Sequence, residues 1–248
     1  RMGFGALGCQ DRHGSQIILV ARVLSDELTA NPVLGEADAD AFLVCPNLAD
    51  DATNDAIAAT LEKRPWGIRL SEFSAAQASQ LATKGADFIV FESMSTQASV
   101  LNEEDLGVIA TLDSSMGDEA IRALSELPLN AALFGPSLRE LPLSFETAID
   151  LQKVLGVLSK PLIVEAPAGI GQRDIELLRD IGVSGLILDL DTKDDIDRIA
   201  TTRKAIDGLP RPKSRRTHGD AFVPTAATEP EGSIATPEED EYEDDEDF

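Results

Sequence analysis

Residues 161–190 are PLIVEAPAGIGQRDIELLRDIGVSGLILDL, and they contain one complete strand–helix–strand unit. The unit opens with the apolar run Leu162–Glu165 and closes with the apolar run Leu186–Leu190. Both runs are nearly continuous, which is typical of strands buried on both faces in a parallel sheet. Between them, Asp174–Ile181 has the spacing of an amphipathic helix, and Gly182 is placed to end it.

Similar units lie along most of the chain. In order, the candidate strands are Ile17–Val23, Ala41–Cys45, Trp66–Leu70, Phe88–Phe91, Val108–Leu112, Ala131–Phe134, Leu162–Glu165 and Leu186–Leu190. Eight such strands in about 190 residues predict a (β/α)8 barrel, and an open doubly wound sheet is the alternative. The first strand carries the weakest signal, because Arg22 interrupts it and the following link contains Pro32 and has room for at most one short helix.

The segments between the strands have helical character, with apolar residues three and four positions apart or acidic residues in the first turn. The predicted helices are Asp50–Lys63, Ser74–Thr83, Gly117–Leu127, Leu143–Leu158, Asp174–Ile181 and Asp194–Ile206.

An internal repeat supports the same fold. Three even-numbered strands follow a short acidic or small entry, in the sequences ADAFLV from Ala39, ADFIV from Ala86 and SGLIL from Ser184. Two odd-numbered strands follow a base and a proline, in KRPWGI from Lys63 and KPLIV from Lys160. A doubled strand–helix unit repeating about every 45 to 50 residues fits four units per barrel.

Composition divides the chain into four parts: an N-terminal extension (1–16), the barrel (17–209), a basic and then low-complexity linker (210–237) and an acidic tail (238–248). Because the chain starts with Arg1 and Met2, a fragment or processed form is an open alternative. Cys9 and Cys45 do not make a disulfide framework, and the apolar run Ile17–Leu24 is too short for a membrane span. We therefore expect a cytoplasmic protein.

The net charge of −24 is shared between barrel and tail. From Arg211 to Phe248 there are 12 acidic and 4 basic residues, a net charge of −8, so −16 falls on the first 210 residues. A protein that binds phosphate backbones needs the opposite sign. This charge argues against nucleic acid and anionic membranes as partners.

The tail Glu238–Phe248 (EEDEYEDDEDF) is nearly all acidic, and like charges keep such a segment extended. It serves either to solubilise the chain or to dock a basic protein partner, with Tyr242 and Phe248 as apolar anchors. A third alternative is a weak, salt-dependent contact with the basic stretch Arg211–Arg216.

Candidate functional residues lie at the C-terminal ends of the predicted strands, where barrel enzymes place their active sites. We call this end the mouth. No lysine or histidine stands at these strand ends, which leaves no obvious Schiff-base nucleophile or neutral-pH base. Carboxylates predominate instead, and we predict Glu92, Glu165 and Asp189 as catalytic candidates.

The same carboxylates with Asp113 could bind Mg²⁺, since several acids around one mouth either raise their pKa values or hold a hard cation. The alternative to a metal site of Glu92, Asp113, Glu165 and Asp189 is that acids after strands cap the next helix, as Asp113 and Asp191 are placed to do. The cofactor is thus none or Mg²⁺.

Substrate-binding candidates are Asn47 and Arg69. Arg69 is the only base that we predict at a strand end, where it could hold a carboxylate or phosphate through two hydrogen bonds. Its alternative is an ion pair with Glu92. Cys45 could be a nucleophile, but buried cysteine is commonly inert.

The stretch Pro161–Leu190 resembles the last two units of phosphate-binding TIM barrels, through the loop Gly169–Gly171, the helix core AspIleGlu and the strand entry GlyVal. The resemblance implies that Gly169 and Gly171 offer backbone N–H groups to a phosphate. It stops after the last strand, where Asp189 and Asp191 replace the small residues of that family and would repel phosphate.

Three functions fit these observations. We favour an interaction or assembly module that uses its acidic tail, and homo-oligomers are compatible with it. The alternative is a carboxylate-based, Mg²⁺-dependent or metal-free lyase or isomerase that acts on a small carboxylated or phosphorylated metabolite at the mouth. A pocketed binding domain is the third.

Overall fold

In the computed structural model, eight parallel strands pair in chain order and close into a barrel. The structure describes residues 17–46, 51–61, 63–113, 115–138 and 140–210. The strands are β1 (Ile18–Leu24), β2 (Ala41–Cys45), β3 (Trp66–Leu70), β4 (Phe88–Phe91), β5 (Gly107–Leu112), β6 (Ala131–Phe134), β7 (Leu162–Glu165) and β8 (Val183–Asp189). This confirms the predicted (β/α)8 fold.

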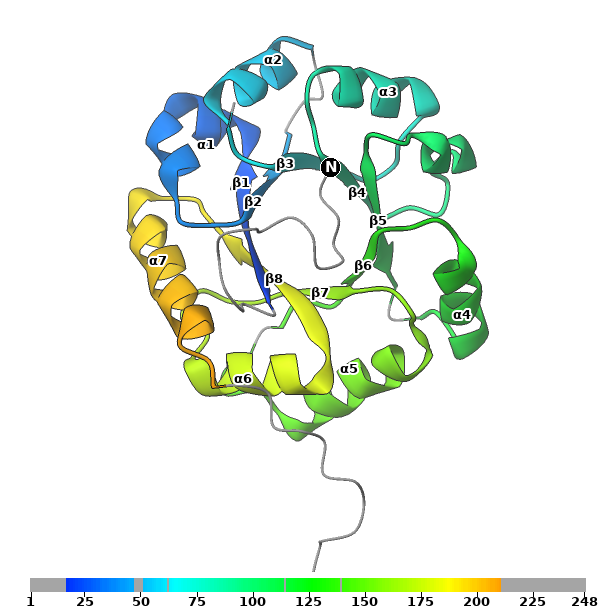
Figure 1. Cartoon of the computed structure of the whole chain (residues 1–248), viewed down its shortest axis with the longest axis vertical. Coiled ribbons are helices and arrows are strands. Elements are labelled where there is room, and N and C mark those ends of the chain that lie inside the picture. The colour runs from blue at the N-terminus through cyan, green and yellow to red at the C-terminus, as the bar shows by residue number, and fades with distance from the viewer. Residues whose placement is uncertain (1–16, 47–50, 62, 114, 139, 211–248) are drawn as a thin grey trace, which may run out of the picture. The chain divides into compact units, whose positions relative to one another are not determined.

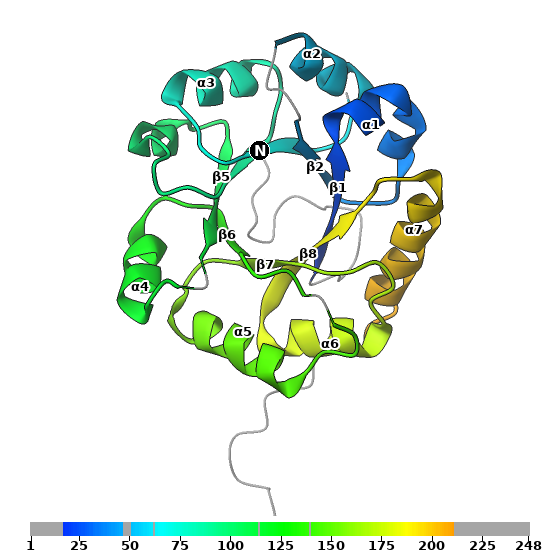
Figure 2. The same ribbon diagram turned by 180° about the vertical axis from the view of Figure 1, so that it is seen from behind.

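Helices surround the barrel on its outside (Figures 1 and 2). They are α1 (Ser25–Ala30), α2 (Asp51–Thr60), α3 (Ala75–Thr83), α4 (Asp118–Glu126), α5 (Phe145–Val157), α6 (Gln172–Ile181) and α7 (Lys193–Asp207). Two short 3-10 helices join them, η1 (Pro32–Glu36) and η2 (Ala98–Asn102), and η2 takes the place of an α-helix between β4 and β5. Within the described ranges, no helix is both long and apolar enough to cross a membrane.

Helix ends follow the sequence signals. Ser74 caps α3 with Gln77 in a reciprocal capping box. Gly182 ends α6 with a φ of 113°, a left-handed conformation that favours glycine, as predicted.

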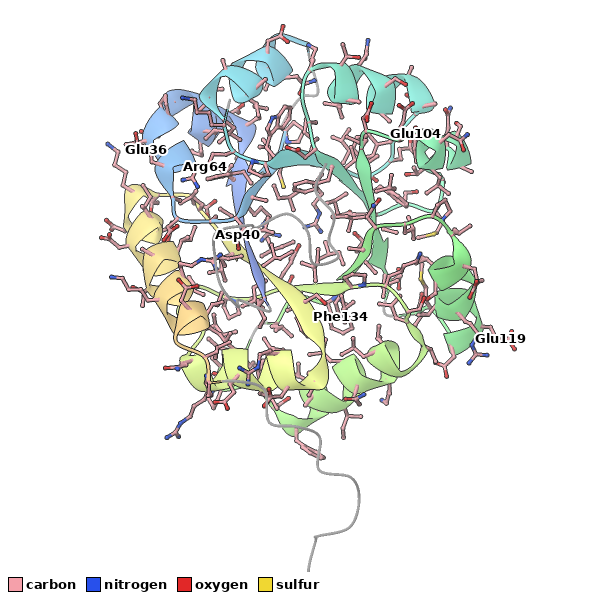
Figure 3. All side chains as sticks on the ribbon, in the orientation of Figure 1. Glu36, Asp40, Arg64, Glu104, Glu119 and Phe134 are labelled. Atoms are coloured by element: carbon pink, nitrogen blue, oxygen red, sulfur yellow. The ribbon has the colours of Figure 1, made fainter. Side chains whose placement is uncertain are left out.

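The first strand is complete, although it carries the weakest sequence signal. Arg22 pairs in register with Leu43 on β2 and with Asp189 on β8. A charged residue fits here because it stands near the strand end, where the guanidinium can reach acids at the mouth. The link to β2 contains α1 and then η1, and Arg64 closes it by donating to the carbonyls of Ala37 and Ala39 at 2.9 and 3.2 Å (Figure 3).

A shared hydrogen-bond arrangement accounts for the aspartate before β2 and β4 in the internal repeat, and it recurs before β6. Asp40, Asp87 and Asn130 each precede an even-numbered strand, and each side chain accepts the backbone N–H at or beside the start of the odd-numbered strand before it, at 2.8 to 3.0 Å. In return, the backbone N–H groups of Asp40, Asp87 and Asn130 donate to the carbonyls of the same partners, Leu19, Trp66 and Val108. The paired bonds tie neighbouring strands together at the N-terminal end of the barrel, opposite the mouth.

The barrel interior is filled by apolar side chains, chiefly Val20, Leu43, Phe88, Val90, Ile109, Leu133, Ile163 and Ile187. They leave a cavity of only about 10 Å³, lined by these residues alone. A space of that size and polarity stays dry. The interior therefore forms a closed apolar floor below the mouth.

Gly67 makes room for this packing, and its replacement gives the first prediction. A Cβ at Gly67 would lie 2.3 Å from the carbonyl oxygen and 2.4 Å from a ring carbon of Phe88, whereas a Cβ at Gly156 in α5 meets nothing within 4 Å. We expect Gly67→Ala to lower the free energy of unfolding by about 2 kcal/mol or more through overpacking. Gly156→Ala should raise it by about 0.5 to 1 kcal/mol through helix propensity. Urea denaturation measures both, and equal effects would contradict the packing argument.

Candidate functional site

A charged layer lies at the mouth, directly above the apolar floor. It consists of Arg22 on β1, Arg69 on β3, Thr111 on β5 and Glu165 on β7. Each of these residues follows, two positions later in its strand, a residue that faces the barrel interior. The register between neighbouring strands advances by about one residue per strand. The four side chains therefore lie at the same height along the barrel axis. Four inward side chains from alternate strands form one layer, as is usual in such barrels. Here the layer is polar.

Glu165 is the centre of the charged layer. Its Oε1 accepts from Nη1 of Arg22 at 2.8 Å and from Nη1 of Arg69. Its Oε2 accepts from the hydroxyl of Ser137, in the loop after β6, at 2.6 Å. The side chain is 7% exposed, so the carboxylate is buried with both of its oxygens occupied.

Each arginine also binds a second carboxylate nearer to solvent. Arg22 Nε lies 2.5 Å from Asp189 Oδ1, and Arg69 Nη2 lies 2.8 Å from Glu92 Oε1. Asp189 and Glu92 are 49% and 48% exposed, and we call them the rim carboxylates. The predicted catalytic residues thus come together around two arginines, and the ion pair predicted as the alternative for Arg69 is confirmed.

The predicted Mg²⁺ site of Glu92, Asp113, Glu165 and Asp189 does not assemble. Within the described ranges, no group of three or more His, Cys, Asp or Glu side chains is placed to hold a metal ion. The arginines take up the negative charge of three of these acids instead. Asp113 accepts the backbone N–H of Ser115 at 2.7 Å in its own exposed loop.

The predicted capping roles also differ from the structure. Gly117 is the N-cap of α4, so Asp113 closes a turn ahead of the helix rather than capping it. Thr192 is the N-cap of α7, where we expected Asp191.

The surroundings of Glu165 and Cys45 shift the pKa values of both groups away from neutral pH. Burial raises the pKa of Glu165, but the Ser137 hydroxyl and the two arginines outweigh it and place the pKa below its ordinary value. Burial raises the pKa of the Cys45 thiol more than Arg69 and Arg22 lower it. At neutral pH, Glu165 is therefore ionised and Cys45 is protonated.

The two glycines of the phosphate-loop resemblance lie after β7. Gly169 has a φ of 92°, and Gly171 is the N-cap of α6. Their role toward phosphate stays a prediction. Asn47 lies outside the described residues.

The helix after β8 shows why the resemblance ends there. Oδ2 of Asp195 accepts the backbone N–H groups of Asp191 and Thr192 at 3.2 and 2.9 Å, and the Thr192 hydroxyl at 2.8 Å. Donors at a helix N-terminus are suited to a phosphate. Here the protein's own Asp195 carboxylate lies at the start of α7 and binds the N–H groups of the two residues before Lys193, and its negative charge opposes a phosphate.

Sequence reasoning missed Arg22 and Thr111, and it placed Ser137 at the end of the sixth strand without a partner. The parity of Ile18, Val20 and Arg22 on β1 could have placed Arg22 in the interior, since alternate residues share a face. Ser137 carries no comparable signal, because a loop brings it to Glu165.

Comparison with known proteins supports the fold. Orotidine 5'-phosphate decarboxylase from Pyrococcus horikoshii OT3 is 13% identical with a TM-score of 0.59, over 76% of this chain and 100% of that one. A mutant tryptophan synthase alpha-subunit from Pyrococcus furiosus is 9% identical with a TM-score of 0.57, over 77% and 96%. The HpcH/HpaI aldolase from Desulfitobacterium hafniense DCB-2 is 12% identical with a TM-score of 0.53, over 81% and 96%.

The chain is a TIM barrel. At these identities the likeness shows the fold alone. No family model matches the sequence, and no curated protein does.

The low pKa of Glu165 predicts a pH dependence. A carboxyl whose pKa is lower when folded stabilises the protein above its unfolded pKa of about 4.3, and this contribution is lost as the pH falls through the folded pKa. We expect Glu165→Gln to lower the free energy of unfolding by about 2 to 3 kcal/mol at pH 7, because both arginines lose their buried partner. The difference from wild type should stay constant above about pH 5 and shrink as the pH falls below the unfolded pKa of about 4.3 in urea titrations.

The matched control for this measurement is Glu126→Gln, an exposed residue of α4. Its difference from wild type should stay near zero throughout. A Glu165→Gln difference that did not change with pH would contradict the proposed ionisation.

The cap at α7 gives a further prediction. Asp195→Ala frees the backbone N–H groups of Asp191 and Thr192, so we expect a loss of about 1 to 2 kcal/mol in the free energy of unfolding. Asp194→Ala, an exposed acid in the same helical turn, is the control and should cost less than about 1 kcal/mol. Thermal and urea unfolding measure both, and equal losses would argue that helix charge rather than capping is responsible.

Proposed function

We propose that this chain is an interaction or assembly module built on a TIM barrel, in which Glu238–Phe248 contacts a basic protein partner. The observation that carries the non-catalytic part is the engagement of Glu165. Both of its oxygens are held, by Arg22 and Arg69 on one side and by Ser137 on the other. A carboxylate in this position is not free to take a proton from a substrate.

General acid–base catalysis works best with a group whose pKa lies near the working pH. At this mouth the pKa of Glu165 is lowered and that of the Cys45 thiol is raised, so both move away from neutrality. The described ranges contain no histidine, since His13 and His218 lie outside them. These features favour an ion-pair network with a structural or binding role over a site of proton transfer.

The partner chemistry follows from charge. Nine of the 11 residues of Glu238–Phe248 are acidic, and the barrel portion of the sequence is acidic as well. Such a chain attracts a basic surface over long range and repels nucleic acid. Tyr242 and Phe248 add apolar contacts within the acidic segment.

A carboxylate-based lyase or isomerase is the second candidate, and the position of the charged layer favours it. Polar side chains lie at the C-terminal end of the strands, where TIM-barrel enzymes act, and proteins of similar fold include a decarboxylase and an aldolase. In this candidate Arg22 and Arg69 hold a carboxylated or phosphorylated metabolite. Glu165, released from them, accepts a proton.

Capture from lysate of the source organism tests the first proposal, with the full chain compared to a chain lacking residues 238–248. We expect the full chain to retain basic proteins, and expect tail removal to reduce their recovery about tenfold or more by quantitative mass spectrometry. A tail with its acids changed to Asn and Gln should behave like the deletion, and salt at about 0.3 M should weaken capture because the attraction is screened. Equal recovery with and without the tail would overturn the proposal.

The second candidate, a lyase or isomerase, is tested by incubating the full chain with a panel of carboxylated and phosphorylated metabolites and measuring turnover. Turnover that is lost in Glu165→Gln but kept in Glu126→Gln would establish the enzyme and replace the non-catalytic proposal.

A further inference from the structure

We propose that the mouth binds a small monocarboxylate between Arg22 and Arg69, in place of the rim carboxylates Glu92 and Asp189. This goes beyond the interaction module, which needs no ligand at the mouth.

The two carboxylate partners of each arginine differ in how firmly they are held. Glu165 is 7% exposed and fixed by three donors, whereas the rim carboxylates Glu92 and Asp189 are about half exposed. An exposed ion pair contributes little, so these side chains can turn into water at small cost. The guanidinium edges that they leave are already oriented by Glu165 and suit a carboxylate, which accepts two parallel N–H bonds.

Thr111 supplies the independent observation. Its side chain faces the barrel interior, because Ile109 two residues earlier belongs to the interior core. The residue is 8% exposed, and its hydroxyl is buried without a hydrogen-bond partner in the described part of the chain. A buried hydroxyl normally has a partner. An unsatisfied hydroxyl in the same layer as two arginines is what a site for a ligand oxygen provides.

Charge and space define the ligand. Arg22, Arg69 and Glu165 together carry one positive charge, which matches a single carboxylate better than a phosphate dianion. The cavity below the layer is about 10 Å³, so the ligand lies above the layer. At the N-terminus of α7, which could have helped a phosphate, Asp195 places a carboxylate whose negative charge opposes one. These features favour a carboxylate with only a few carbon atoms.

The test is calorimetric titration of the full chain with acetate, glycolate and pyruvate, with chloride at matched ionic strength as the blank and inorganic phosphate in parallel. We expect saturable carboxylate binding. Asp189→Asn and Glu92→Gln should tighten it about three- to tenfold, because each removes an internal competitor for an arginine. A purely structural ion pair would give no such gain.

Two further variants locate the site. Thr111→Val keeps the shape, removes the hydroxyl and should weaken binding about fivefold, while the free energy of unfolding in urea stays unchanged or rises slightly. Arg69→Lys should weaken it about tenfold or more, since lysine lacks the planar fork. Glu126→Gln, on the outer helix α4, should leave the affinity as in wild type.

The results of these titrations test the carboxylate site independently of the proposed interaction module. Absence of saturable binding in wild type, Asp189→Asn and Glu92→Gln would overturn it, as would phosphate binding as tightly as the carboxylates. Removal of residues 238–248 should leave carboxylate affinity unchanged, so loss of tail-dependent capture and loss of carboxylate binding are distinguishable.

Discussion

The carboxylate of Glu165 carries a charge inside a barrel that is otherwise filled by apolar side chains. It can do so because Arg22, Arg69 and Ser137 surround it. An isolated charge at this depth would be costly, and each arginine alone would face the same penalty. The four residues therefore depend on one another. Their mutual pairing determines which way the rim carboxylates turn, why the pKa of Glu165 is low and why these acids do not gather around a metal.

Much of the fold could be predicted because its signals are local. Strands buried on both faces give continuous apolar runs, and Ser74 and Gly182 mark helix ends by rules that involve only their neighbours. The membership of the charged layer is different, because it depends on the register of strands far apart in sequence. Glu165 and Asp189 could be placed at the mouth from sequence. Their arginine partners cannot all be assigned from sequence, since Arg22 interrupts an apolar run and only the strand register brings it beside Glu165.

The stretch 161–190 shows how fold and function separate. Its glycines and helix core resemble those of phosphate-binding barrels in sequence, and in the structure Gly169 has a φ of 92° and Gly171 is the N-cap of α6. One side chain, Asp195, places a negative charge at the helix N-terminus and binds the N–H groups of Asp191 and Thr192 ahead of it. A local resemblance can thus predict the strand–helix–strand unit correctly while the binding property depends on a residue beyond it.

Burying the charged layer costs desolvation free energy, and this cost is relevant to function. Replacing a buried ion-pair network with apolar side chains of similar volume is often neutral or stabilising, so pairs such as Arg69–Glu165 are weak devices for stability alone. A barrel used only as a scaffold could carry an apolar layer at this height, as it does immediately below with Leu43, Val90, Leu133 and Ile187. Two arginines and an unsatisfied Thr111 hydroxyl at the open end are the features on which the proposed carboxylate site depends. Within the described residues, this layer replaces apolar packing with polar groups at the mouth, the end of the barrel where TIM-barrel proteins carry their sites.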